Sequence, residues 1–460
     1  MTHPPRLGSL SDIDRRNVFH PFSVLGTHET AGPRRMIVRG SGSTVYDDQD
    51  RPYIDAMAGL WCVNVGYGRQ ELADAIYEQA LRLPFYHSFS SMATDTPALL
   101  AERLIELAPP GMSKVLYGNS GSDANDTQVK LVRLYNNLQG RPEKKKIISR
   151  DRGYHGVSLA SASLTGFASI HAGFDLPIAG ILHTRAPYRL REAEPNESDA
   201  DFVSRLAAEL EATILAEGPE TVAAFIAEPI QAAGGVIVPP DGYFAAIQAV
   251  LRTYDVLLIA DEVVCGFGRL GDWFGSGLLG MEPDLVTVAK GITSAYVPLS
   301  ACIVSERIWR VLADESGGRA FGHGYTYTSH PLSAACAIAN LDLIERDGLC
   351  EQAGRRGAYL NQRLRAAFKD HPLVGEVRGR GLIASVEFVA GTQPTRLFDP
   401  VGSVAARVDA ECLARGVITR ALPDSDTISF SPPFVITEEE IDEVVGVARE
   451  AADVVAAELA

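Results

Sequence analysis

Three short apolar runs in this chain each stop at a charged residue, and they follow one another at intervals of roughly thirty residues. Runs of this length and composition are typical of buried parallel strands, and the spacing leaves room for the crossover helix that such strands need. The carboxyl ends of parallel strands meet at one edge of a sheet, where open α/β sheets bind ligands. We therefore expect the three charged side chains to meet at one edge. The runs are Val222–Ala227 before Glu228, Val256–Ala260 before Asp261, and Leu285–Ala289 before Lys290.

An amine and a carboxylate at one sheet edge indicate a cofactor site. Partial burial there would keep part of Lys290 as the neutral, nucleophilic free base. Lys290 alone is also compatible with a structural lysine whose stem covers apolar surface. The nearby Asp261 favours the chemical interpretation, because buried Asp and Lys residues are rare unless they are paired or functional. Pyridoxal phosphate needs both groups, a lysine for its Schiff base and a carboxylate beside its pyridinium nitrogen.

A candidate phosphate site precedes these strands. Ser120 and Asp123 have the spacing of a capping box, after a short strand and a glycine-containing turn. The backbone amides of Gly121 and Ser122 at that helix start, together with the serine hydroxyls, would hold a phosphate dianion. Any capped helix after a glycine turn has the same pattern, so this signal gains its weight from the strand ends described above.

Five motifs together resemble the landmarks of the class III aminotransferases, which are pyridoxal-phosphate enzymes of fold type I. The resemblance extends from about Tyr46 to Pro433. The motifs are Asn119–Ser122, Tyr154–Gly156, Glu228–Pro229, Asp261–Val263 with Gly266–Arg269, and Lys290–Gly291. Within this class, the features that resemble the amine:pyruvate and β-alanine:pyruvate group, the ω-transaminases, are Trp61, Phe89, the Gln231–Val236 run and Arg420.

The resemblance implies a role for each motif residue. Lys290 forms the Schiff base with pyridoxal phosphate and then moves the proton between substrate and cofactor. Asp261 pairs with the pyridine nitrogen, and Val263 and Tyr154 pack on opposite faces of the ring. The implied cofactor-binding residues are Ser120, Gly121, Ser122, Tyr154, His155, Glu228, Asp261, Val263, Lys290 and Thr326. The implied substrate-binding residues are Trp61, Phe89, Tyr154, Ala233 and Arg420, and no metal ligand is implied.

The implied activity is transfer of an amino group from an amine or ω-amino acid to pyruvate, or to a similar α-keto acid, by a ping-pong mechanism. Arg420 is expected after a short strand at the start of a loop, where its side chain could pair with a substrate carboxylate and swing away for an apolar amine. Ala295, Ser300 and Thr328 depart from the family pattern near the substrate pocket. Other class III activities therefore stay open: an ornithine- or GABA-type transaminase that uses 2-oxoglutarate, an aminomutase or a decarboxylase.

The resemblance also implies an assembly. In the family, a threonine of the partner subunit completes the phosphate site. The Tyr325–Tyr327 segment matches that pattern, so Thr326 is the candidate. The implied assembly is a homodimer, or a tetramer built from it, with shared active sites.

The order of apolar runs and helical segments predicts an α/β fold. From 76 to 334 the alternation predicts a large cofactor-binding domain around a mainly parallel, doubly wound sheet. Residues 1–75 and 335–460 together predict a small α+β domain, because strands are segregated from helices at both chain ends. The strands expected there are Ser43–Tyr46, Ile383–Phe388, Val417–Arg420 and Thr427–Phe430, and Thr437 and Glu440 are expected to cap a closing helix.

Composition and missing motifs argue against other classes. The net charge of −16 disfavours nucleic acid and anionic membranes as partners, and no apolar run approaches membrane-spanning length. Met1–Arg6 lacks the apolar region of a signal peptide, and six scattered cysteines without a CxxC pair indicate the reduced thiols of a cytoplasmic protein rather than disulfides or a zinc site. The motifs of nicotinamide dehydrogenases, serine hydrolases and P-loop NTPases are missing or misplaced. The basic cluster Lys144–Lys146 is expected as a solvated turn.

Overall fold

The computed structural model of the protein describes residues 9–392 and 394–459. Within these residues, a seven-stranded sheet, here called the central sheet, is parallel except for one strand, β10, which runs antiparallel to both of its neighbours. This sheet confirms the predicted α/β fold class. Across the sheet the strands are β4 (Met112–Gly118), β10 (Ser300–Ser305), β9 (Leu285–Val288), β8 (Leu257–Asp261), β7 (Val222–Ala227), β5 (Lys146–Arg150) and β6 (Ile181–Thr184).

Helices cover both faces of the central sheet. Successive side chains of a strand point to opposite faces. On β7, Phe225 and Ala227 belong to one hydrophobic cluster, whereas Ala224 and Ile226 belong to another. Every residue of β7 and β8 is buried, which is the pattern of a sheet covered on both sides. The helices that pack into the two clusters are α10 (Asp199–Glu217) and α11 (Tyr243–Thr253) on the first face and α6 (Gly121–Leu138) on the second.

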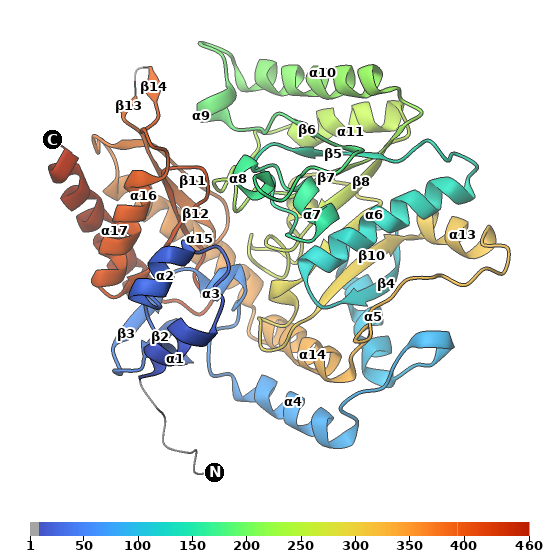
Figure 1. Ribbon diagram of the computed structural model, residues 1–460, viewed down its shortest axis with the longest axis horizontal. Helices are drawn as coiled ribbons and strands as arrows, with labels where there is room; N and C mark the ends of the chain where they lie inside the picture. Colours follow the sequence, from blue (N-terminus) through green and yellow to red (C-terminus); the bar gives the residue numbers. More distant parts are fainter. Residues whose placement is uncertain (1–8, 393, 460) are drawn as a thin grey trace.

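Both chain ends contribute to one part of the molecule, and Figure 1 shows the blue N-terminal elements beside the orange and red C-terminal ones. Strand β3 pairs in parallel with β15, so a strand from near the carboxyl end completes the N-terminal sheet. Among the described residues, the N-terminal sheet has the order β1 (Ile37–Ser41), β2 (Thr44–Asp47), β3 (Pro52–Asp55) and β15 (Val417–Ile418). The C-terminal sheet has the order β11 (Val374–Gly379), β12 (Ala384–Phe388), β17 (Thr427–Phe430) and β16 (Arg420–Ala421), and β13 (Gly391–Thr392) pairs with β14 (Thr395–Arg396).

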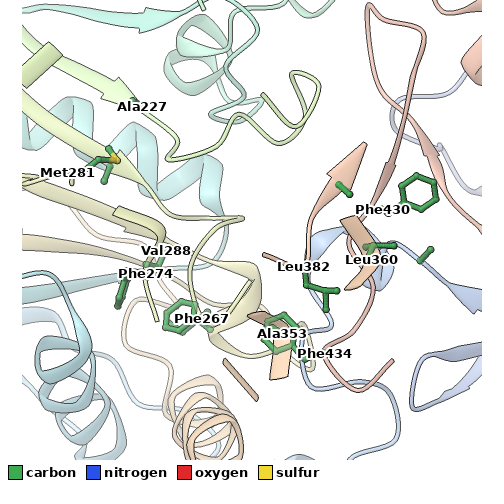
Figure 2. Close-up of a cluster of buried hydrophobic side chains, with 14 of the residues drawn as sticks. Ala227, Phe267, Phe274, Met281, Val288, Ala353, Leu360, Leu382, Phe430 and Phe434 are labelled. Atoms are coloured by element: carbon green, nitrogen blue, oxygen red, sulfur yellow. The ribbon is translucent and has the colours of Figure 1, made fainter. Parts of the chain in front are cut away.

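One hydrophobic cluster extends from the central sheet into this C-terminal part. Its buried members include Val288 and Phe267 in the part that holds the central sheet, and Leu382 and Phe434 in the C-terminal part. In Figure 2, Phe267, Ala353 and Phe434 lie where the two parts meet. The shared core holds the two parts in one arrangement, which fixes the walls of any cavity between them.

The other helices surround these sheets. In the described part of the chain, no helix combines the length and the apolar character that a membrane span requires. The remaining α-helices are α1 (Leu10–Asn17), α2 (Leu25–Ala31), α3 (Ala58–Trp61), α4 (Gln70–Arg82), α5 (Asp95–Leu107), α7 (Leu159–Leu164), α8 (Ala168–His171), α9 (Arg189–Glu192), α12 (Gly275–Leu278), α13 (Glu306–Asp314), α14 (Pro331–Arg346), α15 (Leu349–Ala367), α16 (Ser403–Ala414) and α17 (Glu438–Leu459), and the 3₁₀ helices are η1 (Phe89–Ser91) and η2 (Lys290–Ile292).

The expected strand from Val417 to Arg420 is wrong as a single element. The chain leaves the N-terminal sheet after Ile418 and joins the C-terminal sheet at Arg420. Between them, Thr419 is buried and its Oγ1 donates to Asp409 Oδ1 at 2.9 Å, which anchors the crossing point. Arg420 therefore begins a strand rather than a loop.

The expectation of a solvated turn at Lys144–Lys146 is wrong for Lys144. This side chain is 5% exposed, and its Nζ donates to the carbonyls of Pro219 and Tyr254 at 3.0 Å each. A buried ammonium group needs such partners, and the loops at this end of the central sheet supply them.

The predicted domain boundaries fall inside helices. The boundary at 75/76 lies within α4, and the boundary at 334/335 lies within α14. The division into two domains therefore stays a prediction, and the expectation for Met1–Arg6 lies outside the described residues.

Candidate functional site

A cavity of about 510 Å³ lies at the carboxyl ends of β7, β8 and β9. Its volume is in the range of small-molecule sites. Glu228, Asp261 and Lys290 all line it, so the structure brings the three strand-end residues together. The other predicted site residues that line it are Trp61, Gly121, Ser122, Tyr154, His155, Ala233, Val263 and Arg420.

Asp261 is fixed by hydrogen bonds to both of its carboxylate oxygens. Its Oδ1 accepts from the backbone N–H of Val263 at 3.1 Å. Its Oδ2 accepts from Asn125 Nδ2 at 2.8 Å and lies 2.8 Å from His155 Nδ1. The residue is 2% exposed, and Thr165 Oγ1 in turn accepts the backbone N–H of His155. The carboxylate is therefore rigidly presented to the cavity.

Lys290 has a strained backbone at the cavity. Its φ is +49°, in the left-handed region that a lysine rarely adopts. The following Gly291 packs tightly, because a Cβ there would lie 2.5 Å from Asn64 Nδ2. Lys290 Nζ lies 5.9 Å from the centroid of the Trp61 ring. The turn thus directs the amine to the side of the cavity that Trp61 lines.

Helix α6 begins with the predicted capping box. Ser120 Oγ accepts from the backbone N–H of Asp123 at 3.2 Å, and the Asp123 carboxylate accepts from the N–H of Ser120 at 3.1 Å. Gly121 and Ser122, in the first turn of this 18-residue helix, line the cavity, where unpaired N–H groups and the helix dipole favour an anion. Ser120 itself does not line the cavity, and its hydroxyl caps the helix.

Glu228 organises the wall beside Tyr154. Its carboxylate accepts from the backbone N–H of Tyr154 at 3.0 Å and from that of Ala232 at 3.1 Å. Burial raises the pKa of Glu228, and it also raises the pKa of the Tyr154 hydroxyl. Tyr154 therefore presents a neutral ring to the cavity.

Trp61 and Arg420 lie side by side in the lining of the cavity. Trp61 is 4% exposed, and the Arg420 guanidinium lies 5.0 Å from its ring centroid, which is a cation–π distance. Burial lowers the pKa of Arg420. Among the described residues, the Arg420 guanidinium has no hydrogen bond and no ion pair. It is therefore available to an anionic ligand.

Phe89 and Thr326 do not line the cavity of this chain. Phe89 is 48% exposed in η1, and Thr326 is exposed too. Phe89 lies against the segment that carries Thr326, since a Cβ on Gly324 would be 3.4 Å from Phe89 Cζ. Both therefore belong to one exposed face.

The family model described as "Aminotransferase class-III" matches residues 27–451. This chain belongs to the class III aminotransferases. It is similar to the diaminobutyrate–2-oxoglutarate transaminase of Halomonas elongata, with 52% identity over 95% of this chain and 94% of the relative. The gamma aminobutyrate transaminase 1 of Solanum lycopersicum, a mitochondrial protein, is 46% identical over 92% of this chain and 82% of the relative.

Solved structures agree with the family. The ω-transaminase of Pseudomonas jessenii in complex with PMP has a TM-score of 0.95 and 46% identity, covering 98% of this aminotransferase and 99% of that chain. A transaminase from directed evolution by ancestral reconstruction has a TM-score of 0.96 and 54% identity, with coverages of 98% and 99%. Such values show the same fold over nearly the whole chain.

Class III aminotransferases use pyridoxal phosphate, and the cavity of this aminotransferase fits that cofactor. Lys290 offers an amine, and Asp261 offers a buried carboxylate with both oxygens held. The start of α6 offers backbone amides for a phosphate. The donor set thus matches an aldehyde, a ring nitrogen and a phosphate.

Sequence reasoning missed Asn125 and Phe22. Asn125 bridges Asp261 and the carbonyl of His155, with Nδ2 2.8 and 2.7 Å from the two oxygens. It lies one helical turn after Gly121, so helical periodicity places it on the same side of α6. Phe22 lines the cavity from the N-terminal segment, and no motif signals its position.

A second group of polar side chains lies outside the cavity. Asp14, His20 and His28 bring their ligand-type atoms within 4.8 Å of one another, and His20 Nε2 lies 2.8 Å from Asp14 Oδ1. This hydrogen bond gives the group a structural use between α1 and α2. The expected absence of a metal is not tested by it.

Proposed function

We propose that this aminotransferase moves amino groups from amines or ω-amino acids to pyruvate. The observation that carries the proposal is the unpaired Arg420 guanidinium beside the Trp61 ring in one cavity. Both half-reactions use one cavity, so it must accept an apolar amine and then a keto acid with a carboxylate. Trp61 supplies apolar surface, and Arg420 supplies a cation for the carboxylate. The likeness to the P. jessenii ω-transaminase supports the same activity.

The roles of the cavity residues follow from their chemistry. Pyridoxal phosphate, when bound, supplies a ring that accepts the electron pair released at the substrate carbon. Lys290 would hold the cofactor covalently through Nζ, and its free amine would take and return a proton at that atom. Asp261 keeps a proton on the ring nitrogen, and Asn125 and His155 hold its carboxylate in place.

Other residues orient the cofactor and exclude water. Tyr154 and Val263 would pack against the ring, and the amides of Gly121 and Ser122 would bind the phosphate. Glu228 positions Tyr154 through its backbone N–H. Ser120 supports the phosphate site indirectly, because its cap holds the first turn of α6.

The active unit in this proposal is a homodimer with shared sites. Phe89, Phe321 and Tyr327 are 48%, 45% and 57% exposed, and such a group of large apolar side chains supports a protein interface. Thr326 lies beside Tyr327 on this face and would reach the partner's phosphate site, with Phe89 reaching the partner's substrate cavity. A tetramer built from two such dimers is compatible with the same contacts.

Two further expectations remain proposals. The six cysteines are all free, which supports a reducing compartment and hence the cytoplasm. The two-domain division, with a large domain over 76–334 and a small domain from both ends, is supported by the separate central and C-terminal sheets.

A second candidate is a transaminase that uses 2-oxoglutarate. It is favoured by the names of similar proteins, which are diaminobutyrate–2-oxoglutarate and gamma aminobutyrate transaminases. The same Arg420 would then bind one of the two carboxylates of that acceptor. Half-reaction rates of the wild-type enzyme with pyruvate and with 2-oxoglutarate separate the two candidates.

The test of the proposed function is Arg420→Ala. The change should raise the KM for pyruvate and for ω-amino acids by about tenfold or more, because a charge-assisted hydrogen bond of about 1.5–3 kcal/mol is lost. The half-reaction with an arylalkyl amine should change little, since that substrate has no carboxylate. Stopped-flow spectra of each half-reaction measure the two effects separately.

The control is Lys290→Ala, which should abolish the absorbance of covalently bound cofactor and reduce turnover by several orders of magnitude. Equal losses for charged and uncharged substrates in Arg420→Ala would mean that the arginine is structural. A wild-type enzyme that accepts amino groups on 2-oxoglutarate but not on pyruvate would favour the second candidate.

A further inference from the structure

Residues 231–236, here called the wall segment, carry Ala233 into the cavity. The first half of the segment is held from the side of the central sheet. The Glu228 carboxylate accepts the N–H of Ala232 at 3.1 Å, and Gln231 Nε2 donates to the carbonyl of Asp151 at 2.9 Å. The second half is held by Arg152, which follows Asp151 after β5, and by polar side chains of the C-terminal sheet.

The carbonyls of Gly234 and Gly235 are the points of attachment. Gly235 O accepts from Arg378 Nε at 2.7 Å and from Ser385 Oγ at 3.0 Å, and Gly234 O accepts from Arg152 Nε at 2.8 Å. The close approach of Arg152 and Arg378 to this backbone requires glycine at both positions. A Cβ on Gly234 would lie 2.2 Å from the carbonyl oxygen of Arg152, and a Cβ on Gly235 would lie 2.9 Å from Arg378 Nη2.

Arg378 is itself held in a buried ionic cluster. Its Nη1 lies 2.5 Å from Glu387 Oε2, and its Nη2 donates to the Tyr188 hydroxyl at 2.9 Å. Arg191 pairs with the other Glu387 oxygen at 2.5 Å. Burial alone would raise the pKa of Glu387, but Arg378 and Arg191 outweigh it and lower that pKa. Since Glu387 is fully buried and charged, Arg378 cannot turn away without breaking one of the two ion pairs of this carboxylate.

The same sheet carries Arg420, another residue that lines the cavity. Arg378 lies on β11 and Ser385 on β12 of the C-terminal sheet, whose strand β16 carries Arg420. Arg152 adds a second link, because its Nη1 donates at 3.3 Å to the carbonyl of Asp424, which follows the lining residue Pro423. The wall segment is therefore tied to the part of the chain that carries the lining residues Arg420 and Pro423.

We infer that Arg378 and Ser385 are positioning residues that set, through the Gly235 carbonyl, how large an amine substituent fits beside Ala233. The inference rests on the proposed function, because it requires an amine substituent in this cavity. Neither side chain lines the cavity, so neither contacts the substrate directly. When the Gly235 carbonyl loses a donor, the second half of the wall segment is held less tightly, and a larger substituent is admitted beside Ala233.

The test compares Ser385→Ala and Arg378→Lys with the wild-type holoenzyme. Ser385→Ala removes one of the two donors without changing any charge, and Arg378→Lys keeps the charge but loses the donor geometry. The probes are arylalkyl amines whose alkyl group grows from methyl to propyl, with pyruvate as acceptor. We expect the ratio of kcat/KM for the propyl amine to that for the methyl amine to rise by about three- to tenfold in each variant, mainly through KM.

This ratio is independent of the fraction of active enzyme, so a loss of stability alone does not change it. The matched controls are Ser163→Ala and Arg205→Lys. Ser163 is fully buried, and its Oγ donates to the carbonyl of Leu159. Arg205 lies on α10 and is paired with Glu197 and Glu209. Thermal midpoints of all four variants report stability, and we expect the ratio to stay at the wild-type value in the two controls.

A lower thermal midpoint with an unchanged ratio in Ser385→Ala would overturn the inference, since the cluster would then be only a structural support. Ser385→Ala alone decides the question if Arg378→Lys does not fold. A wild-type enzyme that turns over no amine of the series would contradict the proposed function and with it the inference. Turnover of the series with unchanged ratios would contradict the inference alone.

Discussion

At the scale of single residues, the site is defined less by Asp261 than by what holds it. A carboxylate that keeps a proton on a ring nitrogen must not rotate, and hydrogen bonds from Val263, Asn125 and His155 fix both of its oxygens. All three contacts are made by protein groups, so the carboxylate needs little rearrangement when the ring develops charge.

Asp261→Asn should therefore separate catalysis from binding. The amide keeps the shape of the carboxylate but cannot hold the proton on the ring nitrogen, so kcat should fall by about a hundredfold or more. Cofactor affinity should fall by less than about tenfold, because Lys290 and the start of α6 still bind it. Steady-state kinetics and cofactor titration measure the two separately. If affinity falls and kcat at saturating cofactor does not, Asp261 is only a binding residue.

The residues that could be predicted from the sequence are those whose position follows from local pattern. Asp261 and Lys290 stand at the ends of apolar runs, and the end of a parallel strand has a known place in a sheet. Phe22 reaches the cavity through the tertiary arrangement of the N-terminal segment, which no local pattern encodes. Arg378 is likewise far from every motif, although it holds the wall segment.

At the scale of elements, most strands were predictable, and the failure at Thr419 has a clear cause. A run such as Val417–Arg420 has the composition of one strand, and propensity does not report which sheet each half joins. The buried bond from Thr419 to Asp409 marks the change of sheet. As a result Arg420 is fixed by pairing with β17 instead of lying in a loop, so its motion is confined to the side chain.

Strand β6 carries a residue that should make stability depend on pH. Burial, with help from His171 and His155, lowers the pKa of His183 to about 4. In the unfolded chain this histidine binds a proton near pH 6.5. The contribution of His183 to the free energy of unfolding is therefore complete above about pH 6.5, and it falls by up to about 3 kcal/mol as the pH falls toward 4. His183→Gln should lessen this fall, as measured by thermal midpoints from pH 4 to 7.

The control for this prediction is His87→Gln, a partly exposed histidine on another segment. It should leave the pH dependence close to that of the wild type. Identical slopes for wild type and His183→Gln would show that His183 does not contribute to acid lability.

At the scale of the whole molecule, the shared site can be tested by complementation. Co-expression of Lys290→Ala chains with Thr326→Glu chains should form heterodimers with one intact site each, because that site takes Lys290 and Thr326 from different chains. With random pairing, about one quarter of the wild-type activity should return, although each parent is nearly inactive alone.

The heterodimer is isolated with two different affinity tags, and its activity is compared with that of each parent homodimer. No recovery of activity, with both parents folded and dimeric, would argue against a site shared between subunits. Full activity of the Thr326→Glu homodimer would argue against a phosphate contact from this threonine.

The pairing of β3 with β15 constrains how a nascent chain acquires this structure. Strands β1, β2 and β3 are synthesised long before β15, the strand that completes their sheet. Until then the edge of β3 is open and the apolar surface beneath it is uncovered, a state that favours aggregation. The central sheet is formed from contiguous sequence and can assemble before β15 is made. We therefore expect the growing chain to depend on chaperones for strands β1, β2 and β3 rather than for the central sheet.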